Sequence, residues 1–203
     1  LMGVSEKDYA LSDIVSEEME RSEFIDATDI DVTDLTDTVS GYRIAGVQQI
    51  RSVLQPLQGI YPFDIVPSGY ELKAVRRGKA SVKTIEEGEL SARSYDQEPE
   101  PALKQQREMD KQLPRKVALK HLDASREYSI NLQYSPEKRG NESASVREIE
   151  VPVVLTADEA AQAAEVLQYA PWVGRTRYEF AAGPDHLDIE PADVVTLSTD
   201  DGQ

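Results

Sequence analysis

Cysteine is absent from this chain of 203 residues, and only two histidines and one tryptophan occur. The lack of cysteine excludes disulfide bonds, thiolate metal sites, iron–sulfur clusters and cysteine nucleophiles. No apolar run approaches the roughly 20 residues that span a bilayer, and the first residues lack the basic-then-apolar order of a signal peptide. We therefore expect no membrane insertion.

Basic side chains are also scarce, because 22 Lys and Arg stand against 38 Asp and Glu, for a formal net charge of -16. Such a chain is repelled by phosphate backbones, so we expect no specific binding of nucleic acid. The charge is uneven: residues 1–42 carry -10, residues 43–122 carry +4 and residues 123–203 carry -10. Apolar residues interleaved with both acidic blocks favour folded structure there over disordered acidic tails.

The fold class predicted from the sequence is α+β, beginning with a small α+β domain over residues 1–78. Apolar residues at helical spacing and turn residues at the hairpin carry this prediction. The predicted elements are a helix at 8–21, a strand at 41–45, a helix at 46–58 and a hairpin at 63–75.

Residues 79–113 are polar and weakly periodic, which predicts a linker with a short strand around 81–85. Residues 114–203 alternate with a period of two in several segments, which predicts a mainly antiparallel, barrel-like β domain. The last alternating segment stops abruptly at Leu197, so we expect this domain to be truncated at its C-terminal end.

Two local signals refine the second domain. Pro152 lies out of phase with the apolar residues of its strand, which indicates an edge strand or a bulge. Thr156 and Glu159 have the spacing of a capping box and predict the start of one alanine-rich helix, packed on the sheet and ending near Tyr169. Its small side chains would allow close approach to the sheet.

The motifs of common enzyme classes are absent: Gly-x-Ser-x-Gly, both glycine-rich phosphate loops and His-Glu-x-x-His do not occur. His121 falls on the apolar face of a predicted strand and is interpreted as a packed, hydrogen-bonded residue. His186 is interpreted as a turn or strand-edge residue. We therefore nominate no catalytic, cofactor-binding or metal-binding residue and expect no cofactor.

Asp29 and Asp31 imitate the opening of a calcium loop. Asp34 stands where such a loop has glycine, and Ser40 stands where it has glutamate. The aspartate-rich stretch at 26–37 is therefore better interpreted as an ordinary capped loop.

Carboxylates and aromatic residues leave one alternative function open. The 38 acidic residues offer many carboxylate pairs of the kind that glycosidases use, and sequence spacing does not show their separation. Trp172 with Tyr169 and Tyr178 would suit a sugar-stacking platform, although aromatic residues at a helix end more often belong to a core. A peptidoglycan-hydrolysing or glycan-binding domain is therefore the alternative function.

Seven segments follow one another in a recognisable order: Ser40-Gly-Tyr-Arg-Ile44, Ile50-Arg-Ser-Val-Leu-Gln-Pro-Leu57, Phe63-Asp-Ile-Val66, Leu113-Pro-Arg-Lys-Val117, Tyr128, Val151-Pro-Val-Val-Leu155 and Leu187-Asp-Ile-Glu-Pro-Ala-Asp-Val-Val195. In this order they resemble the phage tail protein family of tail-tip and baseplate-hub proteins, which includes the lambda-type tip attachment protein and the gene transfer agent hub protein. The family commonly has glycine where this chain has Ala192, a small departure at a turn.

The resemblance implies a non-enzymatic structural component of a bacteriophage or prophage tail tip, found in the virion and, during assembly, in the bacterial cytoplasm. The implied partners are further copies of the chain as a trimer, the tail tube or distal tail protein, the tape-measure protein, and a tail fibre or receptor-binding protein. Because a tail conducts DNA, we also expect part of the acidic surface to face its channel and keep the duplex mobile.

Overall fold

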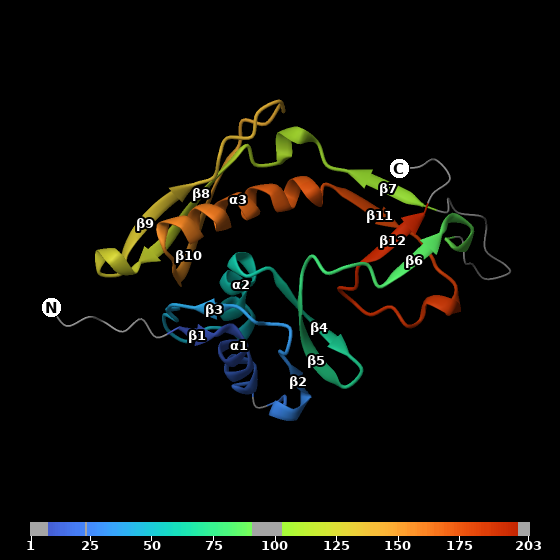
Figure 1. Ribbon diagram of the computed structural model, residues 1–203, viewed down its shortest axis with the longest axis horizontal. Helices are drawn as coiled ribbons and strands as arrows, with labels where there is room; N and C mark the ends of the chain where they lie inside the picture. The colour runs from blue at the N-terminus through green and yellow to red at the C-terminus, as the bar shows by residue number, and fades with distance from the viewer. Residues whose placement is uncertain (1–7, 23, 91–102, 199–203) are drawn as a thin grey trace.

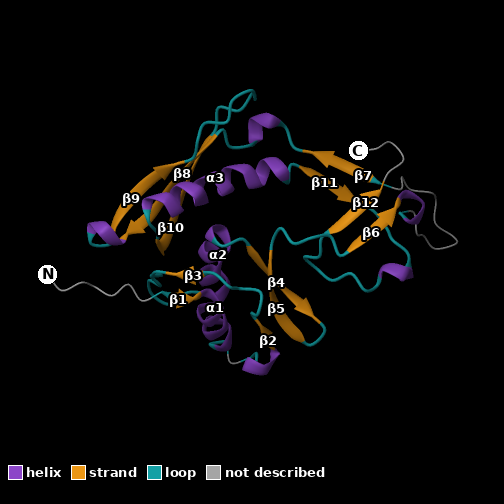
Figure 2. Ribbon diagram, in the orientation of Figure 1, coloured by secondary structure: helices purple, strands orange, loops and turns teal. Residues whose placement is uncertain are grey.

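The computed structural model describes residues 8–22, 24–90 and 103–198, and it confirms the α+β class (Figure 1). Within these residues three α-helices stand among short strands that form five small sheets (Figure 2). The sheets do not close into a barrel, which corrects the barrel-like prediction. The strands near the C-terminal end pair with partners outside the main sheet, so no ring of strands forms.

The first helix, α1 (Leu11–Glu20), confirms its prediction to within a few residues. Leu11, Val15 and Met19 are buried on one side of α1, while Asp13, Glu17 and Glu20 are exposed on the other. The helix follows β1 (Tyr9–Ala10), which pairs antiparallel with β3 (Thr38–Val39). This spacing of apolar residues is what holds the helix on the core.

The loop after α1 contains a 3-10 turn, η1 (Ala27–Asp29), and the short strand β2 (Ile30–Asp31). Asp31 accepts hydrogen bonds from the backbone N–H of Thr33 at 3.0 Å and from its hydroxyl at 2.6 Å. These bonds are the main reason that the pKa of Asp31 is lowered. The aspartate-rich stretch is therefore capped locally, as interpreted.

The second helix, α2 (Ile50–Ile60), begins four residues later than predicted, because neither Gly46, with a φ of 76°, nor Gln49, with a ψ of 141°, has helical backbone angles. It continues past Pro56 and is closed by a 2.7 Å hydrogen bond from the Tyr61 N–H to the carbonyl of Leu57. The predicted strand at 41–45 is reduced to one isolated bridge between Tyr42 and Val153.

The predicted hairpin is confirmed as β4 (Phe63–Ser68) and β5 (Glu71–Arg76), joined through Gly69, whose φ is 60°. A positive φ favours glycine at this turn. On the far side of β5, β2 adds a parallel edge, giving the sheet order β2-β5-β4.

The main sheet contains β8 (Lys116–Asp123), β9 (Ser129–Tyr134) and β10 (Val146–Val154) in the order β10-β8-β9. A 3-10 turn, η4 (Ala124–Arg126), joins β8 to β9, and these two strands are antiparallel. The pairing of β10 with β8 is parallel, which corrects the mainly antiparallel prediction here. The chain between β9 and β10 returns to the start of β8, where the N–H of Arg115 bonds to the carbonyl of Ser145.

Pro152 lies where the register between β10 and β8 shifts, which confirms the predicted irregularity. The third helix, α3 (Ala157–Val173), starts with the predicted capping box of Thr156 and Glu159. It passes Pro171 and ends four residues beyond the predicted Tyr169. Trp172 anchors the added turn, since its indole N–H donates to the carbonyl of Pro114 at 2.8 Å.

The predicted linker carries the short strand expected around 81–85 and, in addition, a strand that was not predicted. These are β6 (Lys83–Glu86), which continues into the turn η2 (Glu87–Glu89), and β7 (Lys104–Arg107), which is followed by η3 (Asp110–Gln112). The C-terminal segment completes two small sheets: β11 (Thr176–Glu179) pairs antiparallel with β7, and β12 (Val195–Ser198), after η5 (Pro184–His186), pairs parallel with β6. Every β7 side chain is polar and exposed, so no alternation of apolar residues predicted this strand.

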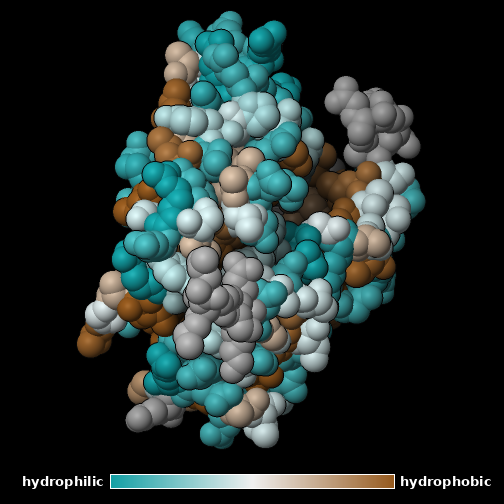
Figure 3. Space-filling view, turned by 60° about the vertical axis from the view of Figure 1, so that its left-hand side comes forward, coloured by the Kyte–Doolittle hydropathy of each residue, from teal (hydrophilic) through white to brown (hydrophobic). Residues whose placement is uncertain are grey.

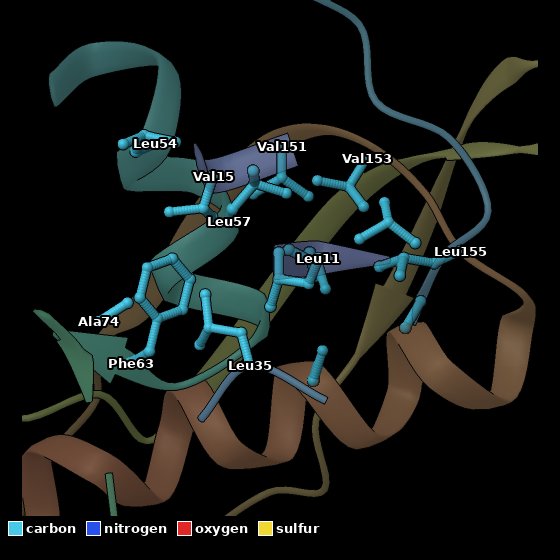
Figure 4. Packing of buried hydrophobic residues seen from close by; sticks show 14 of the residues in the cluster. Leu11, Val15, Leu35, Leu54, Leu57, Phe63, Ala74, Val151, Val153 and Leu155 are labelled. Carbon is cyan, nitrogen blue, oxygen red and sulfur yellow. The ribbon is translucent and has the colours of Figure 1, made fainter. Parts of the chain in front are cut away.

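One buried cluster draws on both predicted domains (Figure 4). Leu11, Leu57 and Phe63 lie on the N-terminal side of the predicted linker, whereas Leu119 and Val153 lie on its C-terminal side. Alanines of α3 complete the cluster and permit close packing against the sheet. The division into 1–78, 79–113 and 114–203 stays a prediction.

Candidate functional site

The two histidines lie in different parts of the fold. His121 on β8 is buried, and its Nδ1 lies 3.1 Å from the carbonyl of Leu122, as expected for a packed residue. His186 in η5 has its Nε2 3.7 Å from a carboxylate oxygen of Glu89. Among the described residues no group of three or more His, Asp or Glu side chains could hold a metal ion. None of the described helices is long and apolar enough to cross a membrane.

Trp172 does not offer an open stacking surface. Its side chain is 8% exposed, and cations lie near its ring: Lys138 Nζ at 5.0 Å and Arg175 Cζ at 5.8 Å from the centroid. Tyr169 is more exposed, with Lys138 Nζ at 4.7 Å from its ring. Tyr178 lies on β11 and does not line the same pocket. The described geometry thus gives Trp172 the role of a core anchor.

Trp172 and Tyr169 line a pocket of about 510 Å³ at the C-terminal end of α3. We call it the basic pocket, because its lining includes four cationic side chains and one carboxylate: Arg107, Lys138, Arg139, Arg175 and Asp110. The carboxylate of Asp110 is engaged by Arg175 at 3.2 Å. In the part of the chain that the structure describes, no carboxylate pairs with the other three cations.

The turn that presents Lys138 and Arg139 is held firmly. Gly140 adopts a φ of 77°, and the Asn141 amide donates to the carbonyl of Lys138 at 2.8 Å. The Asn141 side-chain oxygen accepts the N–H of Ser143 at 2.9 Å, and the Ser143 hydroxyl in turn donates to the carbonyl of Leu113. The turn is thereby tied to the chain entering β8, which holds the backbone of Lys138 and Arg139 beside the pocket.

Acidic residues near these segments in sequence do not neutralise the pocket, because other cations hold them. Glu137 pairs with Arg115 at 2.7 Å. Glu142 lies 3.7 Å from Lys111, and Glu108 lies 3.9 Å from Arg177. The basic pocket therefore keeps an excess of positive charge in a chain whose net charge is -16.

The N-terminal acidic block is neutralised in part by the basic middle of the chain. Asp31 lies 3.7 Å from Lys73, Asp37 lies 3.2 Å from Arg76, and Asp34 pairs with Lys79. The exposed side of α1 is left out of this pairing. We call Asp13, Glu17 and Glu20 the acidic face; of these, Glu17 meets Arg21 at 3.2 Å and Glu20 accepts the Ser16 hydroxyl.

The edge strand β9 presents a second exposed feature. Ile130 is 56% exposed, Leu132 36% and Tyr134 50%, because α3 packs on the opposite face of the sheet. In the ladder with β8, the N–H of Ser135 bonds to the carbonyl of Val117, so alternation turns the backbone groups of these same three residues toward the free edge. There the N–H of Leu132 donates to the side-chain oxygen of Asn131 at 2.9 Å. Elsewhere, the visible surface is largely hydrophilic with scattered apolar patches (Figure 3).

Sequence reasoning missed the basic pocket because its cations come from distant segments: β7, the turn before β10 and the end of α3. The adjacent pair Lys138 and Arg139 before Gly140 was the one local signal. The exposure of β9 was also missed, since its apolar alternation predicts a buried face equally well.

Comparison with known proteins decides the family. A family model described as "Putative phage tail protein" matches residues 49–203. The chain belongs to this phage tail protein family. The predicted resemblance is thereby confirmed.

Among solved structures, a chain described as "Virion of native gene transfer agent (GTA) particle" has the same fold, with a TM-score of 0.86 at 20% sequence identity. The match covers 100% of this phage tail protein and 45% of that chain, so this chain spans less than half the length of its structural match. No curated protein matches it.

Proposed function

We propose that this phage tail protein is a non-enzymatic structural component of the tail tip, where it forms part of the baseplate hub and joins the tail tube to distal receptor-binding parts. The observation that carries the proposal is the family match over residues 49–203. The fold shared along the whole chain with a chain of the gene transfer agent virion supports it.

Surfaces suited to assembly also support the proposal. The free edge of β9 combines exposed apolar side chains with outward backbone groups, and such an edge is a site where another strand adds. The proposed partners are further copies of the chain as a trimer, the tail tube or distal tail protein, the tape-measure protein, and a fibre or receptor-binding protein. Assembly would begin in the bacterial cytoplasm.

The location is tested by fusing an epitope tag to this protein in its phage or prophage and labelling purified particles with gold-conjugated antibody. We expect label at the distal end of the tail in the electron microscope. Label on the capsid, or particles that lack the protein, would overturn the proposal. An untagged particle preparation controls for non-specific labelling.

The absence of hydrolase and glycan-binding activity is part of the proposal. The buried state of Trp172 supports it, because an aromatic ring must be accessible to stack on a sugar. Purified protein incubated with peptidoglycan should release no soluble fragments and should not sediment with the insoluble wall. Release of fragments would instead favour the hydrolase alternative.

The proposal also assigns part of the acidic surface to the wall of the DNA channel. Acidic side chains would repel the phosphate backbone and so leave the duplex free to move. The net charge of -16 supports this assignment. A structure of the assembled tip in which this chain lines the lumen mainly with Arg and Lys would contradict it.

A further inference from the structure

The basic pocket is the strongest unexplained feature of the surface. Arg107, Lys138 and Arg139 converge on one hollow, and no carboxylate of the described residues pairs with them. Arg107 and Arg139 are exposed, so both guanidinium groups are available to a partner. Unpaired cations gathered around a concave site indicate an anionic ligand.

The acidic face of α1 has the complementary chemistry. Asp13, Glu17 and Glu20 follow at spacings of four and three, so they project from one side of the helix over a length of roughly 10 Å. Like charges at this spacing repel one another, and Arg21 reaches only Glu17 and Glu18 of this helix. A cationic partner would relieve the repulsion.

The two surfaces lie on opposite sides of the molecule. In Figure 1, η3 and the C-terminal half of α3, which border the basic pocket, lie above the core, whereas α1 lies below it. One copy therefore cannot satisfy its own pocket with its own α1. Copies stacked head to tail can, and head-to-tail contacts generate closed rings when the rotation between copies closes.

We propose that the basic pocket of one copy binds the acidic face of α1 of a second copy. This inference rests on the self-association included in the proposed function and names the surfaces that make it. Contact between opposite charges at exposed sites is weakened by salt, because screening acts over about 8 Å at physiological ionic strength. Self-association of the purified chain therefore falls as salt rises.

The test is a charge exchange followed by sedimentation velocity at low salt. One double variant reverses the pocket (Arg107→Glu with Arg139→Glu), and the other reverses the helix (Asp13→Lys with Glu17→Lys). Each variant alone should self-associate at least about tenfold more weakly than the wild type, because like charges then meet. An equimolar mixture should form mixed pairs and alternating chains, since the pocket of each variant is opposite in charge to the helix of the other; a closed ring of three would keep one like-charged contact.

The design excludes attraction through net charge, because each exchange changes the charge of -16 by four units and both variants stay negative. The matched control is Arg43→Glu with Arg147→Glu, which reverses two exposed arginines that line neither the basic pocket nor the hollow beside α1 and should associate as the wild type does. Circular dichroism and thermal unfolding verify that all variants fold.

Three results would overturn the inference: a wild-type chain that stays monomeric at low salt, a mixture that fails to associate, or a control variant that weakens association equally. Fluorescence anisotropy with a labelled short DNA duplex tests whether the basic pocket binds nucleic acid instead of the acidic face of α1. If the pocket reversal abolishes DNA binding and leaves self-association intact, the ligand is nucleic acid and the inference is wrong. None of these results bears on the gold-labelling test of tail location.

Discussion

Among single residues, burial shows structural roles that the sequence left open. The sequence left Trp172 as either a core residue or part of a sugar-stacking platform, with the core favoured. The structure buries it, and its indole N–H donates to the backbone carbonyl of Pro114 at 2.8 Å. His121 was interpreted correctly from its place on an apolar strand face. The cations of the basic pocket gave no comparable signal, because nothing in a sequence brings Arg107 close to Arg139.

Trp172→Ala should lower the free energy of unfolding by about 3 to 5 kcal/mol, since it empties a packed site and leaves the carbonyl of Pro114 without its donor. Urea unfolding followed by circular dichroism measures the change. Tyr178→Ala, at a half-exposed strand position, should cost much less. Equal effects of the two changes would show that Trp172 is not the anchor of this helix end.

Tyr61 should make stability depend on alkaline pH. Burial, followed by the nearby charges of Glu159, Asp37 and Asp8, raises its pKa from 10.0 to about 12. Because the folded chain favours the neutral phenol, this contribution is fully present below pH 10 and is lost as the pH rises through about 12. Tyr61→Phe should flatten the decline of stability between these values, as measured by urea unfolding at several pH values. An unchanged slope would contradict the assignment.

Among helices and strands, local signals succeeded and non-local pairing failed. The capping box of α3, the apolar stripe of α1 and the hairpin turn at Gly69 were all predictable, because each depends on neighbouring residues. The parallel pairing of β10 with β8, and the pairing of the predicted linker with the C-terminal strands, depend on segments far apart in the chain. The strand β7 in the predicted linker has only exposed side chains and therefore no hydrophobic pattern.

Thr156→Ala should destabilise the fold by about 1 kcal/mol, because the hydroxyl accepts the N–H of Glu159 at the start of α3. Thermal unfolding measures the loss. Thr156→Ser keeps the capping oxygen and should retain most of the stability. If the serine variant is as unstable as the alanine variant, the cap is not the cause.

Gly41→Ala should cost about 1 to 3 kcal/mol, since an added Cβ would lie 2.8 Å from Cγ2 of Val154 on β10. Val154→Ala removes that clash, so the double variant should be less unstable than the sum of the two single changes. Gly88→Ala, which meets open space, serves as the control. Additive energies in denaturant unfolding would contradict the close contact between the segment at 41–43 and β10.

For the molecule as a whole, the main feature is an uneven distribution of charge over the folded chain. In the folded chain, the N-terminal acidic block is partly neutralised by basic side chains of β5. Separately, an excess of positive charge gathers in the basic pocket at the end of α3. The composition predicted the acidic block. It gave no sign of the basic pocket, because a net charge of -16 does not show where the cations gather. Family membership places that charge pattern in a phage tail protein.

The central proposal is that this chain is built into the tail tip as part of the hub. Cryo-electron microscopy of the intact particle, with averaging of the tail end, tests it most directly. We expect density that fits this fold at the distal end of the tail tube, in three copies around the tail axis. A well-resolved tail tip that holds no copy of this fold would contradict the proposal.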